Sequence, residues 1–217
     1  MSRVEGFSIL VLIAIFVAIA LVARGEATQF DREILLAMRS QSGPTGPGWM
    51  VEVARSITAL GGYTVLTMIV LMVSGYLLLL RDNVTAWFLI AAAASGAVIN
   101  TILKGVFDRP RPDFVNHLVD VVTASFPSGH AALSAVIYLT LGALLAGTHR
   151  SPALRAYYIG TAILLVVLIG LSRIYLGVHY PTDVVAGWAF GAAWALICGL
   201  VLRTLQKNRV ARQPENP

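Results

Sequence analysis

Three short segments of the chain combine side chain types that could act on a phosphate group. Residues 172–183 bring an arginine, a histidine and a carboxylate together between two apolar stretches. Ionisable groups near membrane depth are costly, and they usually mark a functional site. The partners of this segment are the basic residues 104–112 and the sequence Pro-Ser-Gly-His at 127–130. We expect the three segments to meet at one phosphate-binding site.

Five residues of these segments could bind the oxygens of a phosphate ester. Lys104, Arg111 and Arg173 supply positive charge. A guanidinium matches phosphate through two hydrogen bonds, whereas an ammonium acts as a point charge. Ser128 and Gly129 stand at the start of an apolar stretch, where the free amides of a helix N-terminus favour an anion.

Two histidines could supply a nucleophile and an acid. Asp183 follows His179 by four residues, and Pro181 between them suits a first helical turn. The carboxylate could therefore point back at the imidazole, fix its tautomer and leave the other ring nitrogen free to attack phosphorus. His130, close to a bound phosphate, would be protonated and ready to donate. The residues alone do not say which histidine attacks.

The composition places these segments in an integral membrane protein. Of 217 residues, 57% are hydrophobic and 12% are charged, which is too apolar for an ordinary soluble domain. One domain is expected over residues 1–217, with a polar tail at 206–217. The single cysteine, Cys198, excludes a disulfide framework and a cysteine metal site. The net charge of +5 lacks a nucleic-acid-binding pattern, so anionic lipid is the better partner.

Six apolar stretches are long enough to cross a bilayer, which predicts an all-α polytopic bundle. The first could be a signal peptide, but its length, the preceding Glu5 and the bulky Leu21 near the candidate cleavage position favour a retained span. Asn100, in the third stretch, is interpreted as an interhelical hydrogen-bonding residue. The six stretches are 7–23, 63–80, 84–103, 131–147, 156–171 and 184–202.

Residues 24–62 are amphipathic and are expected to cap the end of the bundle. Phe30, Ile34, Leu35 and Met38 recur at helical spacing among charged residues, which is typical of a helix lying along the membrane interface. A Gly- and Pro-rich break follows, and Trp49 then suits an interfacial anchor. A functional alternative for this cap is a lateral gate for a lipid.

Counting spans puts the three chemical segments on one side of the membrane. One follows the third span, one opens the fourth, and one joins the fifth to the sixth. The Lys and Arg residues divide evenly, eight on each side, but on the site side three belong to the chemical segments and four to the amphipathic loop. The positive-inside rule then favours cytoplasmic termini and a site facing the periplasm or cell exterior of a bacterial inner membrane.

Taken together, the three segments resemble the signature of the type 2 phosphatidic acid phosphatase superfamily. The matching elements are Lys104-x6-Arg111-Pro112, Pro127-Ser128-Gly129-His130 and Ser172-Arg173-x5-His179-x3-Asp183. Their order and spacing agree with the family, and the resemblance covers roughly residues 60–205. The first span and the amphipathic segment fit it more loosely.

The resemblance implies a membrane phosphatase that uses neither a metal nor a cofactor. It implies that His179 is the nucleophile that forms a phosphohistidine, that Asp183 orients it, and that His130 protonates the leaving group. Arg109-Pro110 repeats the Arg-Pro pair two residues early, and the spacing from Lys104 selects Arg111. The residues that the resemblance assigns to the phosphoryl oxygens are Lys104, Arg111, Ser128, Gly129 and Arg173.

The expected substrate is a lipid phosphate such as phosphatidylglycerol phosphate or phosphatidic acid. The alternative is undecaprenyl diphosphate, because the signature concerns the phosphate and not the lipid tail. A zinc site of His130, His179 and Asp183 would be opposed by the three cations. A serine hydrolase built on Ser128 lacks the Gly-x-Ser-x-Gly sequence, and a small transporter should show an internal repeat that is missing here. Nothing in the sequence indicates an oligomeric state.

Overall fold

Helices dominate the computed structural model, which describes residues 3–23, 27–40 and 43–211. Within these residues the helices are α1 (Arg3–Val22), α2 (Gln29–Ala37), α3 (Trp49–Ala59), α4 (Tyr63–Leu79), α5 (Asn83–Phe107), α6 (Gly129–Thr148), α7 (Pro152–Tyr175) and α8 (Pro181–Ala211). Two strands of two residues, β1 (Arg39–Ser40) and β2 (Gly43–Pro44), form a small antiparallel hairpin. The all-α prediction is confirmed.

Five of the helices, namely α1, α5, α6, α7 and α8, are long and apolar enough to cross a membrane. The predicted second span differs in detail, because α3 and α4 form a pair bent by 42° that meets the length and composition criteria only together. Gly61 lies at this bend. A Cβ there would stand 2.4 Å from Ile169 and 3.5 Å from the His130 ring, so the glycine allows the bend to approach both α7 and α6.

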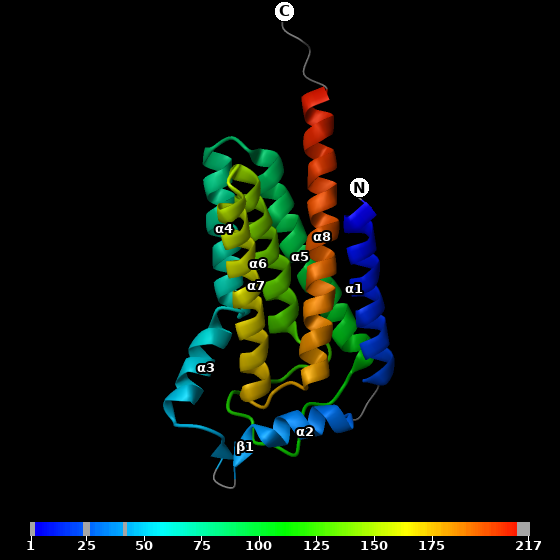
Figure 1. Cartoon of the computed structure of the whole chain (residues 1–217), viewed down its shortest axis with the longest axis vertical. Coiled ribbons are helices and arrows are strands. Elements are labelled where there is room, and N and C mark those ends of the chain that lie inside the picture. Colours follow the sequence, from blue (N-terminus) through cyan, green and yellow to red (C-terminus); the bar gives the residue numbers. More distant parts are fainter. Residues whose placement is uncertain (1–2, 24–26, 41–42, 212–217) are drawn as a thin grey trace, which may run out of the picture.

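The centre of the bundle is α6, which packs against α5, α7 and α8 (Figure 1). Small residues allow the close contact between α6 and α8. A Cβ on Gly191 would lie 2.3 Å from the carbonyl oxygen of Ala132, and one on Gly187 would lie 2.8 Å from that of Ser128. This packing of small residues brings the start of α8 beside the start of α6.

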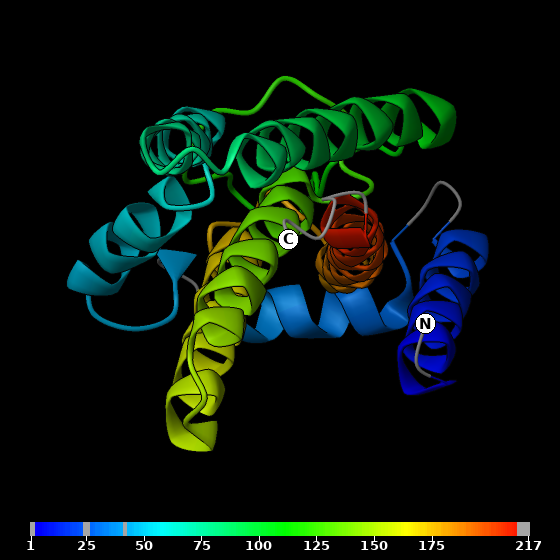
Figure 2. The same ribbon diagram turned by 90° about the horizontal axis from the view of Figure 1, so that it is seen from above.

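Helix α2 lies across the end of the bundle, under α8 and beside the lower end of α1 (Figures 1 and 2). Its first turn is fixed by a capping box, in which Thr28 and Asp31 each accept the other's backbone N–H. Leu35 is buried against the bundle, whereas Phe30 points outward and is 57% exposed. The predicted amphipathic helix is therefore present, but Phe30 is on its outer face.

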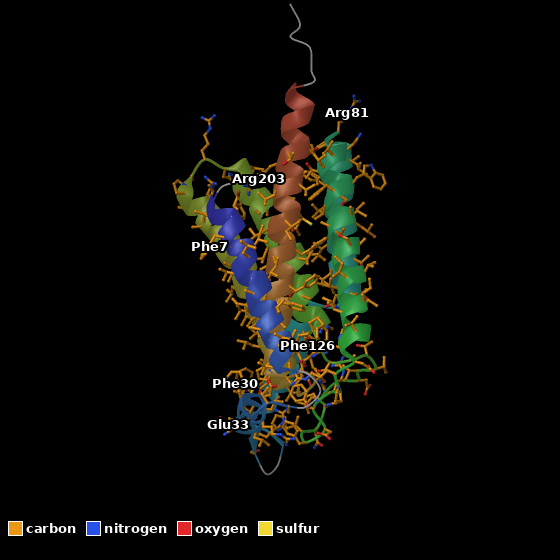
Figure 3. The ribbon with its side chains drawn as sticks, turned by 90° about the vertical axis from the view of Figure 1, so that its right-hand side faces the viewer. Phe7, Phe30, Glu33, Arg81, Phe126 and Arg203 are labelled. Atoms are coloured by element: carbon orange, nitrogen blue, oxygen red, sulfur yellow. The ribbon has the colours of Figure 1, made fainter. Side chains whose placement is uncertain are left out.

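Both ends of the described chain lie at the end of the bundle opposite α2. Figure 3 shows Arg81 and Arg203 at that end, and Phe30 and Glu33 at the other. Helix α1 runs along α8, and its Glu5 pairs with Arg203 on α8. This arrangement agrees with an even number of crossings between the two ends.

Candidate active site

The three predicted segments meet at the end of the bundle that α2 covers. Lys104 lies in the last turn of α5, Arg173 in the last turn of α7, and Asp183 in the first turn of α8, which begins at Pro181 as expected. The backbone N–H of Ser128 donates to the carbonyl oxygen of Asp183 at 3.0 Å. The starts of α6 and α8 are thereby joined. All three segments lie at the same end of the bundle, as counting the spans predicts.

His179 is 2% exposed, and its two ring nitrogens face opposite kinds of group. Its Nε2 lies 3.3 Å from Nη1 of Arg111. Its Nδ1 lies 3.3 Å from the hydroxyl oxygen of Ser125 and 3.5 Å from Oδ2 of Asp183. The Ser125 hydroxyl also donates to Asp183. The expected carboxylate is therefore next to Nδ1, but a hydroxyl group bridges the two.

The environment of His179 keeps its imidazole neutral. Burial lowers the pKa of His179 well below its ordinary value, and the positive charges of Arg111, Arg173 and Lys104 lower it further. A neutral imidazole has one protonated nitrogen and one free lone pair. With the proton on Nδ1, next to Ser125 and Asp183, the lone pair is on Nε2 and faces the cations.

Backbone carbonyls and the hydroxyls of Thr58 and Thr123 hold the three cations in place. Arg111 donates from Nε to Thr123 at 2.7 Å and from Nη1 to Val178 at 2.6 Å. Lys104 donates to the carbonyl oxygen of Ala124. Arg173 donates from Nη1 to the hydroxyl of Thr58 at 3.0 Å. Lys104, Arg111 and Arg173 also interact electrostatically with His130 and His179, so five predicted residues share one site.

Two buried polar atoms of the predicted residues lack a hydrogen-bond partner in the part of the chain that the structure describes. They are the hydroxyl oxygen of Ser128 and Nε of Arg173. Buried polar groups are normally paired, so each unpaired one calls for an explanation. Both belong to the predicted phosphate-binding set, and a bound oxyanion would accept hydrogen bonds from both.

Polar groups also face Gly129 at the start of α6. A Cβ at this position would lie 3.2 Å from the hydroxyl oxygen of Tyr63, 3.3 Å from Nδ2 of Asn100 and 3.7 Å from Cε of Lys104. Asn100 is fully buried and stands one turn before Lys104 on the same face of α5. The amide that we interpreted only as interhelical is thus next to the predicted site, and the missing side chain of Gly129 leaves room for it.

Arg109 and Asp31 are part of this site, although the sequence motifs do not include them. Arg109 is 1% exposed, and it lies behind Asp183 rather than beside His179. A signal existed for each. Pro110 and Pro112 disfavour a helix over Arg109 and Arg111, and residues two apart in an extended segment point the same way. Asp31 shares its helix face with Leu35, which marked it as inward-facing.

The arrangement differs from that of a zinc site. Among residues 3–23, 27–40 and 43–211, no three His, Cys, Asp or Glu side chains are grouped closely enough to hold a metal ion. His130, His179 and Asp183 therefore do not form the ligand set that the zinc alternative requires.

Comparisons with known proteins agree with this geometry. Residues 85–207 match the PAP2 superfamily. Phosphatidylglycerophosphatase B of Bacillus subtilis is 32% identical over 145 residues, which cover 66% of this chain and 70% of that protein. Decaprenylphosphoryl-5-phosphoribose phosphatase of Mycobacterium tuberculosis is 33% identical over 181 residues, which cover 82% and 94% of the two chains.

A solved structure extends the likeness to the whole fold. The crystal structure of the transmembrane PAP2 type phosphatidylglycerolphosphate phosphatase from Bacillus subtilis superposes with a TM-score of 0.80 at 25% identity. The match covers 97% of this chain and all of that one. With more than half of its residues matched to the family and a shared transmembrane fold, the chain belongs to the PAP2 superfamily, and it is a membrane-embedded hydrolase of phosphoric esters.

Proposed function

We propose that the protein removes the terminal phosphate from a phospholipid, either phosphatidylglycerol phosphate or phosphatidic acid, through a phosphohistidine formed on His179. The observation that supports this most directly is that the two ring nitrogens of His179 face different kinds of group. Its Nε2 is 3.3 Å from Arg111, on the cationic side, and its Nδ1 faces Ser125 and Asp183. A nucleophilic nitrogen needs this combination of a free lone pair and an oriented second nitrogen.

In the first step, Nε2 of His179 attacks phosphorus while the bond from phosphorus to the alcohol oxygen breaks. The dianionic phosphate bound beside His130 favours its protonated form, and His130 gives this proton to the leaving oxygen, so the lipid leaves as a neutral alcohol. Lys104, Arg111 and Arg173 neutralise the equatorial oxygens, together with the amides at the start of α6. The positive charge that develops on the imidazole is balanced by Asp183 through Ser125.

In the second step, a water molecule attacks the phosphorus of the phosphohistidine. His130, now neutral, takes a proton from the water, and the phosphorus–nitrogen bond breaks with its electron pair returning to Nε2. Inorganic phosphate leaves, and both histidines regain their starting protonation states. No metal ion takes part in either step.

A polyprenyl phosphate is the second candidate substrate. The relative named for a decaprenyl-linked phosphate matches over 82% of this chain and 94% of its own. Both shares are larger than those covered by the match to the relative named for phosphatidylglycerol phosphate. The cationic site would bind either phosphate equally well. The choice therefore depends on the lipid tail and on the cap that lies over the site.

A substrate panel tests the proposal. Purified protein in liposomes with EDTA would be given phosphatidylglycerol phosphate, phosphatidic acid, lysophosphatidic acid and undecaprenyl diphosphate, and phosphate release would be measured. We expect kcat/KM to be at least about tenfold higher for the two diacyl phospholipids, a difference of about 1.4 kcal/mol. The opposite order would favour the polyprenyl candidate, and a requirement for added zinc would contradict the metal-free mechanism.

We further propose that the site faces the outside and that both termini are cytoplasmic. The connection between α6 and α7 carries Arg150 at the end opposite α2, where positive charge favours the cytoplasm. In a Cys198→Ser background, a cysteine replacing Glu33 on α2 should react with an impermeant maleimide in intact spheroplasts. A cysteine replacing Arg150 should react only after lysis. The reverse pattern would invert the proposed orientation.

A further inference from the structure

We propose that Asp31, on the interfacial helix α2, is a positioning residue for the carboxylate of Asp183 and acts on it through Arg109. The inference rests on the roles proposed above for His179 and Asp183. Nη2 of Arg109 lies 3.0 Å from Oδ2 of Asp31, and Nη1 lies 2.6 Å from Oδ1 of Asp183. All three side chains are at most 1% exposed. Asp31 is outside residues 85–207, which match the family.

The shared guanidinium fixes the orientation of the Asp183 carboxylate. A guanidinium is planar and rigid, so two acids on its two terminal nitrogens are held at a set angle to each other. Oδ1 of Asp183 is bound to Arg109, and this leaves Oδ2 to face Ser125 and His179. The Arg109 guanidinium also stacks over the ring of Tyr180, with Cζ 4.2 Å from the ring centre. Moving Asp31 would therefore rotate or shift the carboxylate that orients His179.

Asp31 also holds the backbone of the turn that contains Asp183. Its Oδ1 accepts the backbone N–H of Thr182 at 3.0 Å, and its Oδ2 accepts the Thr182 hydroxyl at 2.9 Å. The same hydroxyl oxygen accepts a hydrogen bond from Arg109 at 2.8 Å. Asp31 thus caps the N-terminus of α8 from another helix, where a negative charge is favourable. Asp31 therefore binds both the backbone and the side chain of Thr182, the residue before Asp183.

The charges of this cluster suit the proposed reaction. Two carboxylates share one guanidinium, so the Asp31–Arg109–Asp183 cluster carries a net negative charge beside Nδ1 of His179. That charge stabilises the imidazole as it becomes positive during attack on phosphorus. Without Asp31, Arg109 would neutralise Asp183 alone, and the stabilisation of the imidazole would weaken.

The test compares Asp31→Asn with Glu33→Gln, which removes the same charge from the outer face of the same helix. Glu33 is exposed. Among the residues that the structure describes, its side chain forms a hydrogen bond only with the surface residue Gln29. With short-chain phosphatidic acid in detergent, we expect Asp31→Asn to lower kcat about 10- to 100-fold, as expected for a catalytic group displaced by about 1 Å. KM should stay within about threefold, because the phosphate contacts are unchanged. Glu33→Gln should match the parent protein.

A spectroscopic measurement separates positioning from a purely structural role. The ring nitrogens of His179 in ¹⁵N-histidine-labelled protein should report a proton on Nδ1 in the parent and in Glu33→Gln, and a changed proton distribution in Asp31→Asn. Arg109→Lys, which keeps the charge but loses the planar fork, should lower kcat in the same way. If Asp31→Asn does not elute as a folded protein, Thr182→Val is the second variant, with an expected fall in kcat of about 3- to 10-fold.

A kcat for Asp31→Asn within twofold of the parent, or a change confined to KM, would overturn the proposal. So would an unchanged His179 spectrum. These outcomes differ from failure of the proposed function, because full turnover by His179→Ala would remove the nucleophile assignment whatever Asp31 does. The spectrum would still show whether Asp31 controls the imidazole.

Discussion

Replacing His179 with glutamine is expected to lower turnover of every lipid phosphate by at least about 10⁴-fold, because it removes the atom that bonds to phosphorus. Losses of this size follow removal of a nucleophile even when the binding groups remain. Lys104, Arg111 and Arg173 would still bind the substrate, so KM should change little. Phosphate release by the purified variant, together with acid-labile ³²P labelling of the protein, measures both the rate and the intermediate.

The matched control is His149→Gln. His149 lies at the opposite end of the bundle and stacks on Tyr158, with ring centres 5.3 Å apart. That variant should keep the parent rate. A His179→Gln protein with wild-type turnover, or one that still acquires label, would exclude His179 as the nucleophile.

The reactive fraction of the His179 imidazole depends on pH, and the direction of this dependence follows from the surroundings of the ring. The deprotonated imidazole is the reactive form, and burial and the neighbouring cations lower the pKa of His179. The fraction of reactive imidazole in the free protein should therefore stay near its maximum as the pH falls from 8 to 6, where an ordinary histidine becomes protonated. A ¹⁵N titration of the His179 ring would show this directly, and protonation near pH 6.5 would contradict it.

The meeting of three distant segments was predictable because the number of crossings between them is fixed by the apolar stretches. Once each stretch crosses the membrane, the end of α5, the start of α6 and the turn between α7 and α8 have to emerge together. The hydrophobic pattern therefore constrains the site without any knowledge of side chain packing. The same pattern was insufficient at Gly61, where the amphipathic helix α3 joins the apolar helix α4 at a bend that the missing side chain allows.

The groups that orient the site were harder to predict, because their positions depend on the path of the irregular segment between α5 and α6. The carbonyl oxygens of Thr123 and Ala124 hold Arg111 and Lys104, and such backbone atoms leave no trace in the side chain pattern. Ser125 belongs to the same segment. Asp31 approaches Asp183 only through the packing of α2 across the bundle, which no sequence spacing encodes.

Replacing His130 with alanine is expected to affect substrates differently according to their leaving groups. An alcohol leaving from a phospholipid needs a proton, so its turnover should fall about 10²- to 10⁴-fold, the usual contribution of a positioned acid. p-Nitrophenyl phosphate releases a phenolate that is stable without a proton. Its first step should therefore continue at a rate close to that of the parent protein.

The second step separates His130 from a residue that only binds phosphate. Water must lose a proton as it attacks the phosphohistidine, and without His130 no imidazole is placed to accept it. Hydrolysis of the intermediate should slow for both substrates, so p-nitrophenyl phosphate should give a burst of nitrophenol equal to the enzyme concentration, followed by a slow steady rate. Label from ³²P should then remain on His179. An equal loss for both substrates with no burst would instead assign His130 to binding, because a phosphate contact is needed whatever group leaves.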